Sequence, residues 1–151
     1  MKHLTSERGQ SLVELAISIL ILIYLLAGAV EFGLAFFQYV QLRDAAQEGA
    51  LYGSMAPSDT AGIIARVQGA STSPIDLSGG DVTITISIDG IDSGDTTNYA
   101  TVDCEGHGLK VTVSYLHQIF MPFIPEFIGS STIPLNATVT DTILSPVNCI
   151  P

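Results

Sequence analysis

Glu14 is the residue whose chemistry is hardest to reconcile with its neighbours, because it stands at the start of the most apolar stretch of the sequence. No other charged residue occurs between it and Glu31. A carboxylate at the centre of a membrane-spanning helix costs roughly 2.5–3.5 kcal/mol on insertion scales. Since such a group must be paired or protonated in a low-dielectric environment, we expect Glu14 to meet a positively charged partner.

Other groups of potential ligands are weaker. The segment 89–95, DGIDSGD, has an aspartate at every third position, whereas an EF-hand loop needs ligands at alternate positions and a terminal glutamate. Cys104, His107 and His117 lack the paired spacing of a zinc site. There is no nucleophile elbow and no phosphate-binding glycine loop in the sequence. We therefore predict a solvated acidic loop, no metal, no cofactor and no enzyme activity.

The two cysteines, Cys104 and Cys149, lie far apart in the sequence. In an oxidising compartment they would form a disulfide that closes a loop of about 45 residues, worth roughly 4 kcal/mol in the chain-entropy model. Two free thiols are the alternative. In both cases the pair is structural, because no neighbouring base would activate a nucleophile.

Composition restricts the class of partner. The chain has 5 Lys and Arg against 15 Asp and Glu, and its net charge is −10. From residue 43 onwards the only basic residues are Arg43, Arg66 and Lys110. Nucleic-acid binding is excluded, because phosphate contacts need clustered basic side chains.

A long helix is expected over residues 10–55, since no proline occurs before Pro57. Such a helix is about 70 Å long, roughly twice the hydrocarbon thickness of a bilayer. Its first half is apolar on all sides and predicts a membrane span over residues 12–30. Its second half is amphipathic, with apolar and small residues at helical spacing: Tyr39, Leu42, Ala46, Gly49 or Ala50, and Gly53.

The charges that flank the span predict its orientation. Lys2 and Arg8 precede it, and acidic residues dominate the rest of the chain. The positive-inside rule places the N-terminus in the cytoplasm and the remainder outside a cytoplasmic membrane that the chain crosses once.

Three interpretations of this N-terminal region remain. The first is an ordinary anchor carrying an extracytoplasmic module that binds a ligand or cation. The second is a secretory signal cut after Ala29, in the small-residue segment 27–29. The third is a type IV prepilin, in which residues 1–9 are a cytoplasmic leader. Cleavage after Gly9 would make Gln10 the new N-terminus and Glu14 its fifth residue.

The third interpretation is strengthened by a resemblance. Residues 9–53 are similar to the TadE-like pseudopilins of the tight-adherence (Tad) pilus. The family typically has a G-x-x-x-V-E-F opening, an E-F-G step and an A-x-x-A-A-R-E-G-A-R stretch. Here the corresponding pieces are Gly9 with Val13-Glu14-Leu15, Glu31-Phe32-Gly33, and residues 44–50. Leu15, Leu34, Gln47 and Leu51 depart from the pattern, and three of the four replace frequently basic residues.

The resemblance implies a minor pilin-like subunit without enzyme activity. Its implied partners are a prepilin peptidase, other pilin subunits, the inner-membrane assembly machinery and the bilayer. Glu14 would neutralise the N-terminal amine of a neighbouring subunit, and the finished protein would reside in the membrane or in an extracellular filament. Whether it is a major, minor or tip subunit stays open.

Three residues of the helix are candidate subunit contacts. Glu31 lies near the outer membrane interface, where it is either solvated or paired with another subunit. Gly49 and Gly53 form a G-x-x-x-G step that lets another backbone approach closely. That neighbour is either the sheet of the same domain or a helix of another subunit.

Residues 56–151 predict an extracytoplasmic α+β domain. The segment Ser58-Asp59-Thr60 is expected to cap a short helix, and three segments alternate apolar and polar residues as strands do: DVTITISID, LKVTVSYL and IPLNATVTDTIL. A further short strand is expected at residues 99–102. Each strand has one apolar face, so an antiparallel sheet should pack on the amphipathic half of the long helix. This is a pilin-like arrangement.

One segment interrupts the alternation. YLHQIFMPFIPEFIGSS contains Phe120, Phe123 and Phe127 among other apolar residues, and its prolines prevent a regular helix across it. Such a segment packs under the sheet, lies on the membrane or contacts another subunit.

Overall fold

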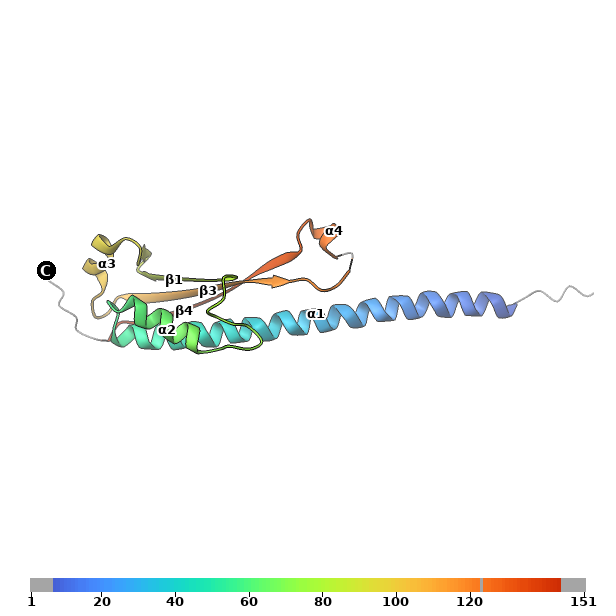
Figure 1. Cartoon of the computed structure of the whole chain (residues 1–151), viewed down its shortest axis with the longest axis horizontal. Coiled ribbons are helices and arrows are strands. Elements are labelled where there is room, and N and C mark those ends of the chain that lie inside the picture. Colours follow the sequence, from blue (N-terminus) through green and yellow to red (C-terminus); the bar gives the residue numbers. More distant parts are fainter. Residues whose placement is uncertain (1–6, 123, 145–151) are drawn as a thin grey trace, which may run out of the picture.

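The computed structural model describes residues 7–122 and 124–144 of the chain. A long helix with a four-stranded antiparallel sheet confirms the predicted α+β class (Figure 1). The elements in order are α1 (Glu7–Met55), α2 (Thr60–Gly69), β1 (Val82–Ile88), β2 (Ile91–Asp92), α3 (Thr96–Val102), β3 (Gly108–Gln118), α4 (Ile124–Ile128) and β4 (Thr132–Thr142).

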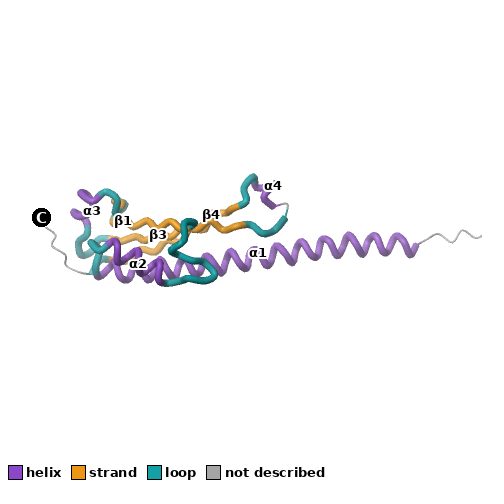
Figure 2. Tube along the Cα trace, in the orientation of Figure 1, coloured by secondary structure: helices purple, strands orange, loops and turns teal. Residues whose placement is uncertain are grey.

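Helix α1 extends along the whole molecule, and its N-terminal half projects beyond every other element (Figures 1 and 2). It is continuous because no proline interrupts it. It ends at Met55, two residues before Pro57, whose ring disfavours helical backbone at the preceding residue. The sheet and α2 lie beside the C-terminal half of this helix (Figure 1).

The sheet has the strand order β2-β1-β3-β4, and every neighbouring pair is antiparallel. Its register aligns apolar side chains across three strands on one face. Val111 of β3 pairs with Ile86 of β1 and Val139 of β4, and Val113 pairs with Ile84 and Ala137. On the opposite face the hydroxyl oxygens of Thr112 and Thr138 are 3.1 Å apart. The alternation seen in the sequence thus places one face against the helices and leaves the other polar.

The core is formed where this apolar face meets α1 and α2. Leu42, Ala45 and Ala46 of α1 are completely buried, as are Ile63 and Val67 of α2. Alanines at these positions allow the sheet to approach the helix closely. The buried stripe begins at Leu42, because Tyr39, expected to belong to it, is 41% exposed.

Residues 99–102 are helical, which corrects the predicted short strand. They form the end of α3, whose first turn is capped by Asp95: its side chain accepts a hydrogen bond from the Asn98 backbone N–H. Tyr99 is buried, and its hydroxyl donates to the Pro57 carbonyl at 3.0 Å. This tertiary contact, together with the cap, outweighs the β propensity of the local sequence.

Candidate functional site

The projecting half of α1 exposes apolar side chains on every face. This surface is far larger than the scattered apolar residues of an ordinary soluble protein. It belongs to the one described helix that is long and apolar enough to cross a membrane. Large apolar residues that are at least 45% exposed there are Leu12, Val13, Leu15, Ile17, Ile19, Leu20, Ile21, Leu22, Ile23, Leu25, Leu26, Val30, Phe32 and Leu34.

Gly9, Gln10 and Glu14 lie together in the first turns of α1, and all three are exposed. Gln10 and Glu14 are four residues apart, so they share one face of the helix, with Ile17 and Ser18 continuing it. The Ser18 hydroxyl donates a hydrogen bond to the Glu14 backbone carbonyl at 2.8 Å, not to the Glu14 carboxylate. Within the described part of the chain, the ion pairs do not involve Glu14.

A second polar group lies where α1 leaves its apolar half. His117, near the end of β3, is 1% exposed. Its Nε2 atom is 3.0 Å from Oε1 of Glu31, and its Nδ1 atom is 2.5 Å from Oε1 of Gln38. The same Glu31 oxygen accepts the Phe120 backbone N–H at 3.2 Å. The buried imidazole ring of His117 therefore links β3 to two side chains of α1.

Two hydrogen-bonding states of the His117 ring satisfy its contacts with Glu31 and Gln38. Both ring nitrogens face oxygen atoms, so an imidazolium satisfies both contacts and pairs with the Glu31 carboxylate. Rotation of the Gln38 amide would let a neutral ring do the same. In either state the buried polar groups have partners, as a stable interior requires.

Sequence reasoning did not identify this cluster. It predicted Glu31 near the outer membrane interface and considered only solvent or another subunit as its partner. The usable signals were the β3 alternation, which puts His117 in phase with Leu109 and Val113, and the seven-residue spacing of Glu31 and Gln38, which is two helical turns.

The two candidate glycines of α1 face their own domain. A Cβ atom on Gly49 would lie 2.5 Å from Val67 Cγ2, and one on Gly53 would lie 2.8 Å from Leu109 Cδ2. Both residues are buried. Of the two interpretations offered for this step, the geometry matches close packing on the domain's own elements, and the folded domain leaves these glycines no surface for a second subunit.

The structure describes only some of the remaining residues that were predicted as subunit contacts or as a disulfide. Phe120 is 74% exposed at the turn after β3. Phe127 lies in α4, and Phe123 lies outside the described residues. Cys104 is nearly buried, but Cys149 lies beyond the last described residue, so their disulfide stays a prediction.

The acidic segment 89–95 is used for local structure. The carboxylate of Asp89 contacts Nδ1 of His107 at 2.5 Å and accepts the Gly108 backbone N–H at 3.0 Å. These hydrogen bonds, the one to His107 first, hold the pKa of Asp89 below its usual value. Hydrogen bonds to the Asn98 side chain and backbone lower the pKa of Asp95 likewise. Among the residues described, no three histidine, cysteine or acidic side chains are grouped as metal ligands.

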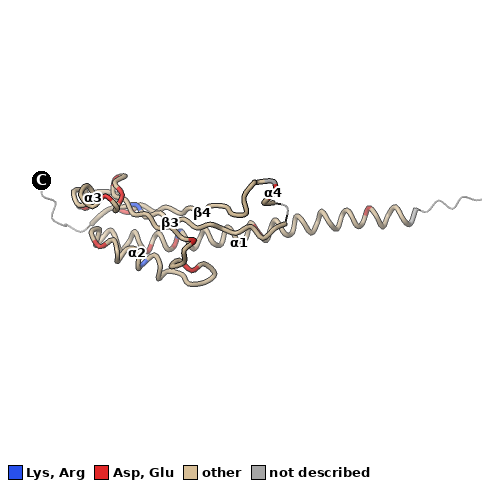
Figure 3. Tube along the Cα trace, turned by 45° about the horizontal axis from the view of Figure 1, so that its top comes forward, with Lys and Arg blue, Asp and Glu red and all other residues tan. Residues whose placement is uncertain are grey.

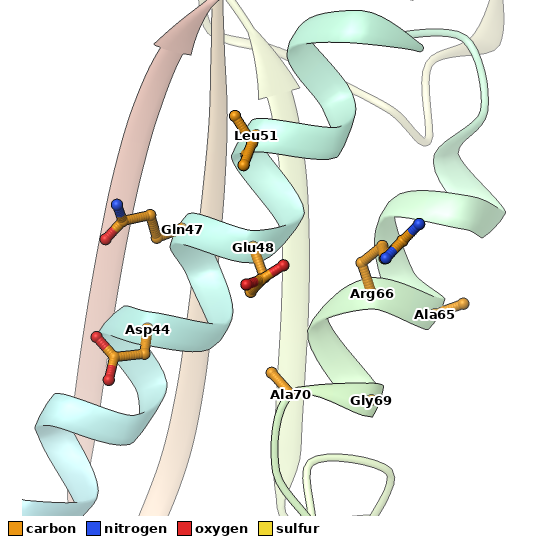
Figure 4. Close-up of a pocket in the computed structure, with 8 residues that line it drawn as sticks. All are labelled: Asp44, Gln47, Glu48, Leu51, Ala65, Arg66, Gly69 and Ala70. Atoms are coloured by element: carbon orange, nitrogen blue, oxygen red, sulfur yellow. The ribbon is translucent and has the colours of Figure 1, made fainter.

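A shallow groove separates α1 from α2 (Figure 4). Glu48 lies between the helices, whereas Asp44 and Gln47 point away from α2. Arg66 is oriented over the Tyr52 ring, 5.2 Å from its centroid. The groove is open, and the rest of its lining is Leu51 of α1 together with Ala65, Gly69 and Ala70 in and just after α2, so it offers no enclosed site.

The comparisons with known proteins bear on the N-terminal region. The family model described as TadE-like protein matches residues 9–51, which confirms the predicted resemblance. The match covers 43 of the 151 residues, all of them within α1. Neither curated proteins nor solved structures yielded a match to the chain.

Proposed function

We propose that this chain is a pilin-like subunit of a Tad-type pilus, cleaved by a prepilin peptidase after Gly9 and assembled through its N-terminal helix. Other pilin or pseudopilin subunits and the inner-membrane assembly machinery are its partners. Before assembly it crosses the cytoplasmic membrane once, with the sheet domain outside.

The observation that carries this proposal is a contrast within α1. The domain buries apolar side chains of the C-terminal half, whereas apolar side chains of the N-terminal half are largely exposed. Leu42 and Ala45 are buried by the domain, whereas Leu20 is 59% exposed and has nothing in the described chain to cover it. Lipid can cover such a surface in the membrane, and neighbouring apolar helices can cover it in a filament.

Glu14 distinguishes a filament subunit from a plain anchor. An anchor gains nothing from a carboxylate beside its apolar span, because the charge opposes insertion. Cleavage after Gly9 creates a positive amine on Gln10, and the Glu14 carboxylate has no ion-pair partner among the described residues. A neighbouring subunit's amine would remove most of the cost of burying that carboxylate and would fix the axial register of the two helices.

N-terminal sequencing of the protein recovered from membranes that contain the peptidase tests the proposal. A mature chain that starts at Gln10 supports it. A chain that keeps Met1 would indicate a plain anchor, and one that starts at Val30 would indicate a secreted domain. Either of these results contradicts the proposal.

A pair of variants shows whether cleavage depends on the expected position. Gly9→Leu should leave the leader attached, because a bulky side chain would replace the small residue before the cut. Gly33→Leu is the matched control, since a Cβ atom at Gly33 meets nothing within 4 Å. It should be processed normally.

A further inference from the structure

The β3–β4 hairpin extends past the rest of the sheet toward the apolar half of α1 and carries α4 at its end (Figure 1). We call residues 116–122 and 124–133 the hairpin tip. We propose that this tip inserts into the outer leaflet beside α1, as a second, shallow contact between the protein and a lipid surface. The inference rests on the membrane span of the proposed function but not on pilus assembly.

The position of the tip along α1 is the first argument. A Cβ atom on Gly28 would lie 4.0 Å from Met121 Cε, so the tip reaches the level of Gly28. Gly28 is two residues before the end of the predicted span at Val30, about 3 Å along the helix axis. The tip and the outer end of the span therefore occupy the same depth.

The composition of the tip is the second argument. Among the side chains that the structure describes, the large apolar ones exposed at the tip are Leu116 at 46%, Phe120 at 74%, Ile128 at 56% and Ile133 at 39%. Glu126 is the only Asp, Glu, Lys or Arg in residues 116–133. Elsewhere the domain is rich in acidic residues, which gather away from the tip (Figure 3). An apolar surface of this kind, beside the outer end of the predicted span, suits the boundary between headgroups and acyl chains.

The cluster around His117 makes this placement physically reasonable. Polar backbone and side-chain groups near the bilayer must be satisfied within the protein. Glu31 accepts hydrogen bonds from both the His117 ring and the Phe120 backbone, so the base of the tip carries its own partners. The same contacts tie the tip to α1 and set its depth relative to the span.

The chain contains no tryptophan, so a single Phe120→Trp substitution gives a specific fluorescent probe. The full chain would be reconstituted in phosphatidylcholine vesicles whose acyl chains carry bromine either near the headgroup or near the chain end. Leu20→Trp, in the span, is the deep reference. Leu144→Trp is the aqueous reference, because the Leu144 backbone binds the Ser54 carbonyl, about 40 Å along α1 from Gly28.

We expect Phe120→Trp to be quenched at least about twofold more than Leu144→Trp, and more strongly by shallow than by deep bromine, as for elements buried ~5–10 Å into the boundary. Ile128→Trp should behave alike. Both positions are largely exposed, so the larger ring creates no clash, and circular dichroism verifies the fold.

Three results would overturn the inference. Quenching of Phe120→Trp at the level of Leu144→Trp would place the tip in water. A blue-shifted but unquenched emission that reverts when the protein is diluted in lipid would mean that a second copy covers the tip. Failure of bromine to quench Leu20→Trp would contradict the membrane span on which the inference rests. The N-terminal sequence of the mature chain tests the pilin proposal separately.

Discussion

Leu42, Ala45 and Ala46 in the C-terminal half of α1 are fully buried, whereas Leu20 and Leu25 in the N-terminal half are 59% and 71% exposed. The two halves belong to one uninterrupted helix. In the C-terminal half, small residues allow the sheet to pack closely, and the chain provides its own partner. Around Leu20 and Leu25 the described residues leave the helix exposed, and the proposed cover of this part is lipid or the helices of other subunits.

The largest expected difference between the halves is in the stability of the domain. Leu42→Ala should lower the free energy of unfolding by about 2–5 kcal/mol, because it leaves a cavity between α1 and the sheet. Leu20→Ala, at a position that packs against no element of the domain, should leave that free energy nearly unchanged. Denaturant unfolding of the full chain in detergent micelles measures both, and equal losses would contradict the division of α1.

Glycine substitutions compare a closely packed position of α1 with an open one, because an added methyl group overpacks only the first. Gly49→Ala puts a methyl group 2.5 Å from Val67 Cγ2, so we expect a loss of about 1–3 kcal/mol. Gly33→Ala should be neutral or slightly stabilising, because alanine is the better helix former and the space around Gly33 is open. A destabilised Gly33→Ala would show that the open face of α1 beside the Glu31–His117 junction also packs on the domain.

The junction between the halves depends on His117. His117→Leu removes the ring that satisfies Glu31 and Gln38 and leaves polar groups without partners, at a cost of roughly 1–3 kcal/mol. His117→Gln should lose less, since an amide can still bond to one of them. The unfolding free energies of the two variants provide the measurement, and the cluster would be unimportant if both matched the unmodified protein.

The smallest expected effect is a pH dependence confined to the domain. Asp59 accepts hydrogen bonds from the Gly62 N–H and the Tyr52 hydroxyl, which lower its pKa. Because the folded pKa of Asp59 is depressed, as are those of Asp89 and Asp95, the stabilisation is present at neutral pH and is lost as the pH falls below about 4.

Matched variants assign this dependence. Asp59→Asn keeps a good helix cap but does not titrate, so its unfolding curve should respond less to acid. Glu14→Gln, in the projecting half, should keep the full acid response of the unmodified protein. A reduced acid response in Glu14→Gln would contradict the separation of the two halves.

Periodicity predicted most of the fold, because the elements that it identified are locally encoded. The absence of proline defines α1, and strict alternation defines β1, β3 and β4. The local sequence of Tyr99 favoured a strand, but a cap and a contact with Pro57 made it helical.

The junction cluster was missed for a related reason. His117 is bonded to residues 79 and 86 positions away in the sequence, and no local pattern specifies such pairs. The proposed pairing residue Glu14 was singled out for the opposite reason, since a carboxylate beside an apolar run stands out without any tertiary information. Gly9, the proposed cleavage residue, followed from its place five residues before that glutamate.

The pairing of the Glu14 carboxylate with an amine on another subunit is the central claim, and filament incorporation of Glu14→Gln tests it most directly. The variant should insert into the membrane normally, yet its recovery with sheared filaments should fall at least about tenfold, since losing one partner of a buried charge pair costs roughly 2–5 kcal/mol. Glu48→Gln, the same substitution on the exposed surface of the packed half, should assemble normally. Incorporation of Glu14→Gln equal to that of Glu48→Gln would contradict the claim.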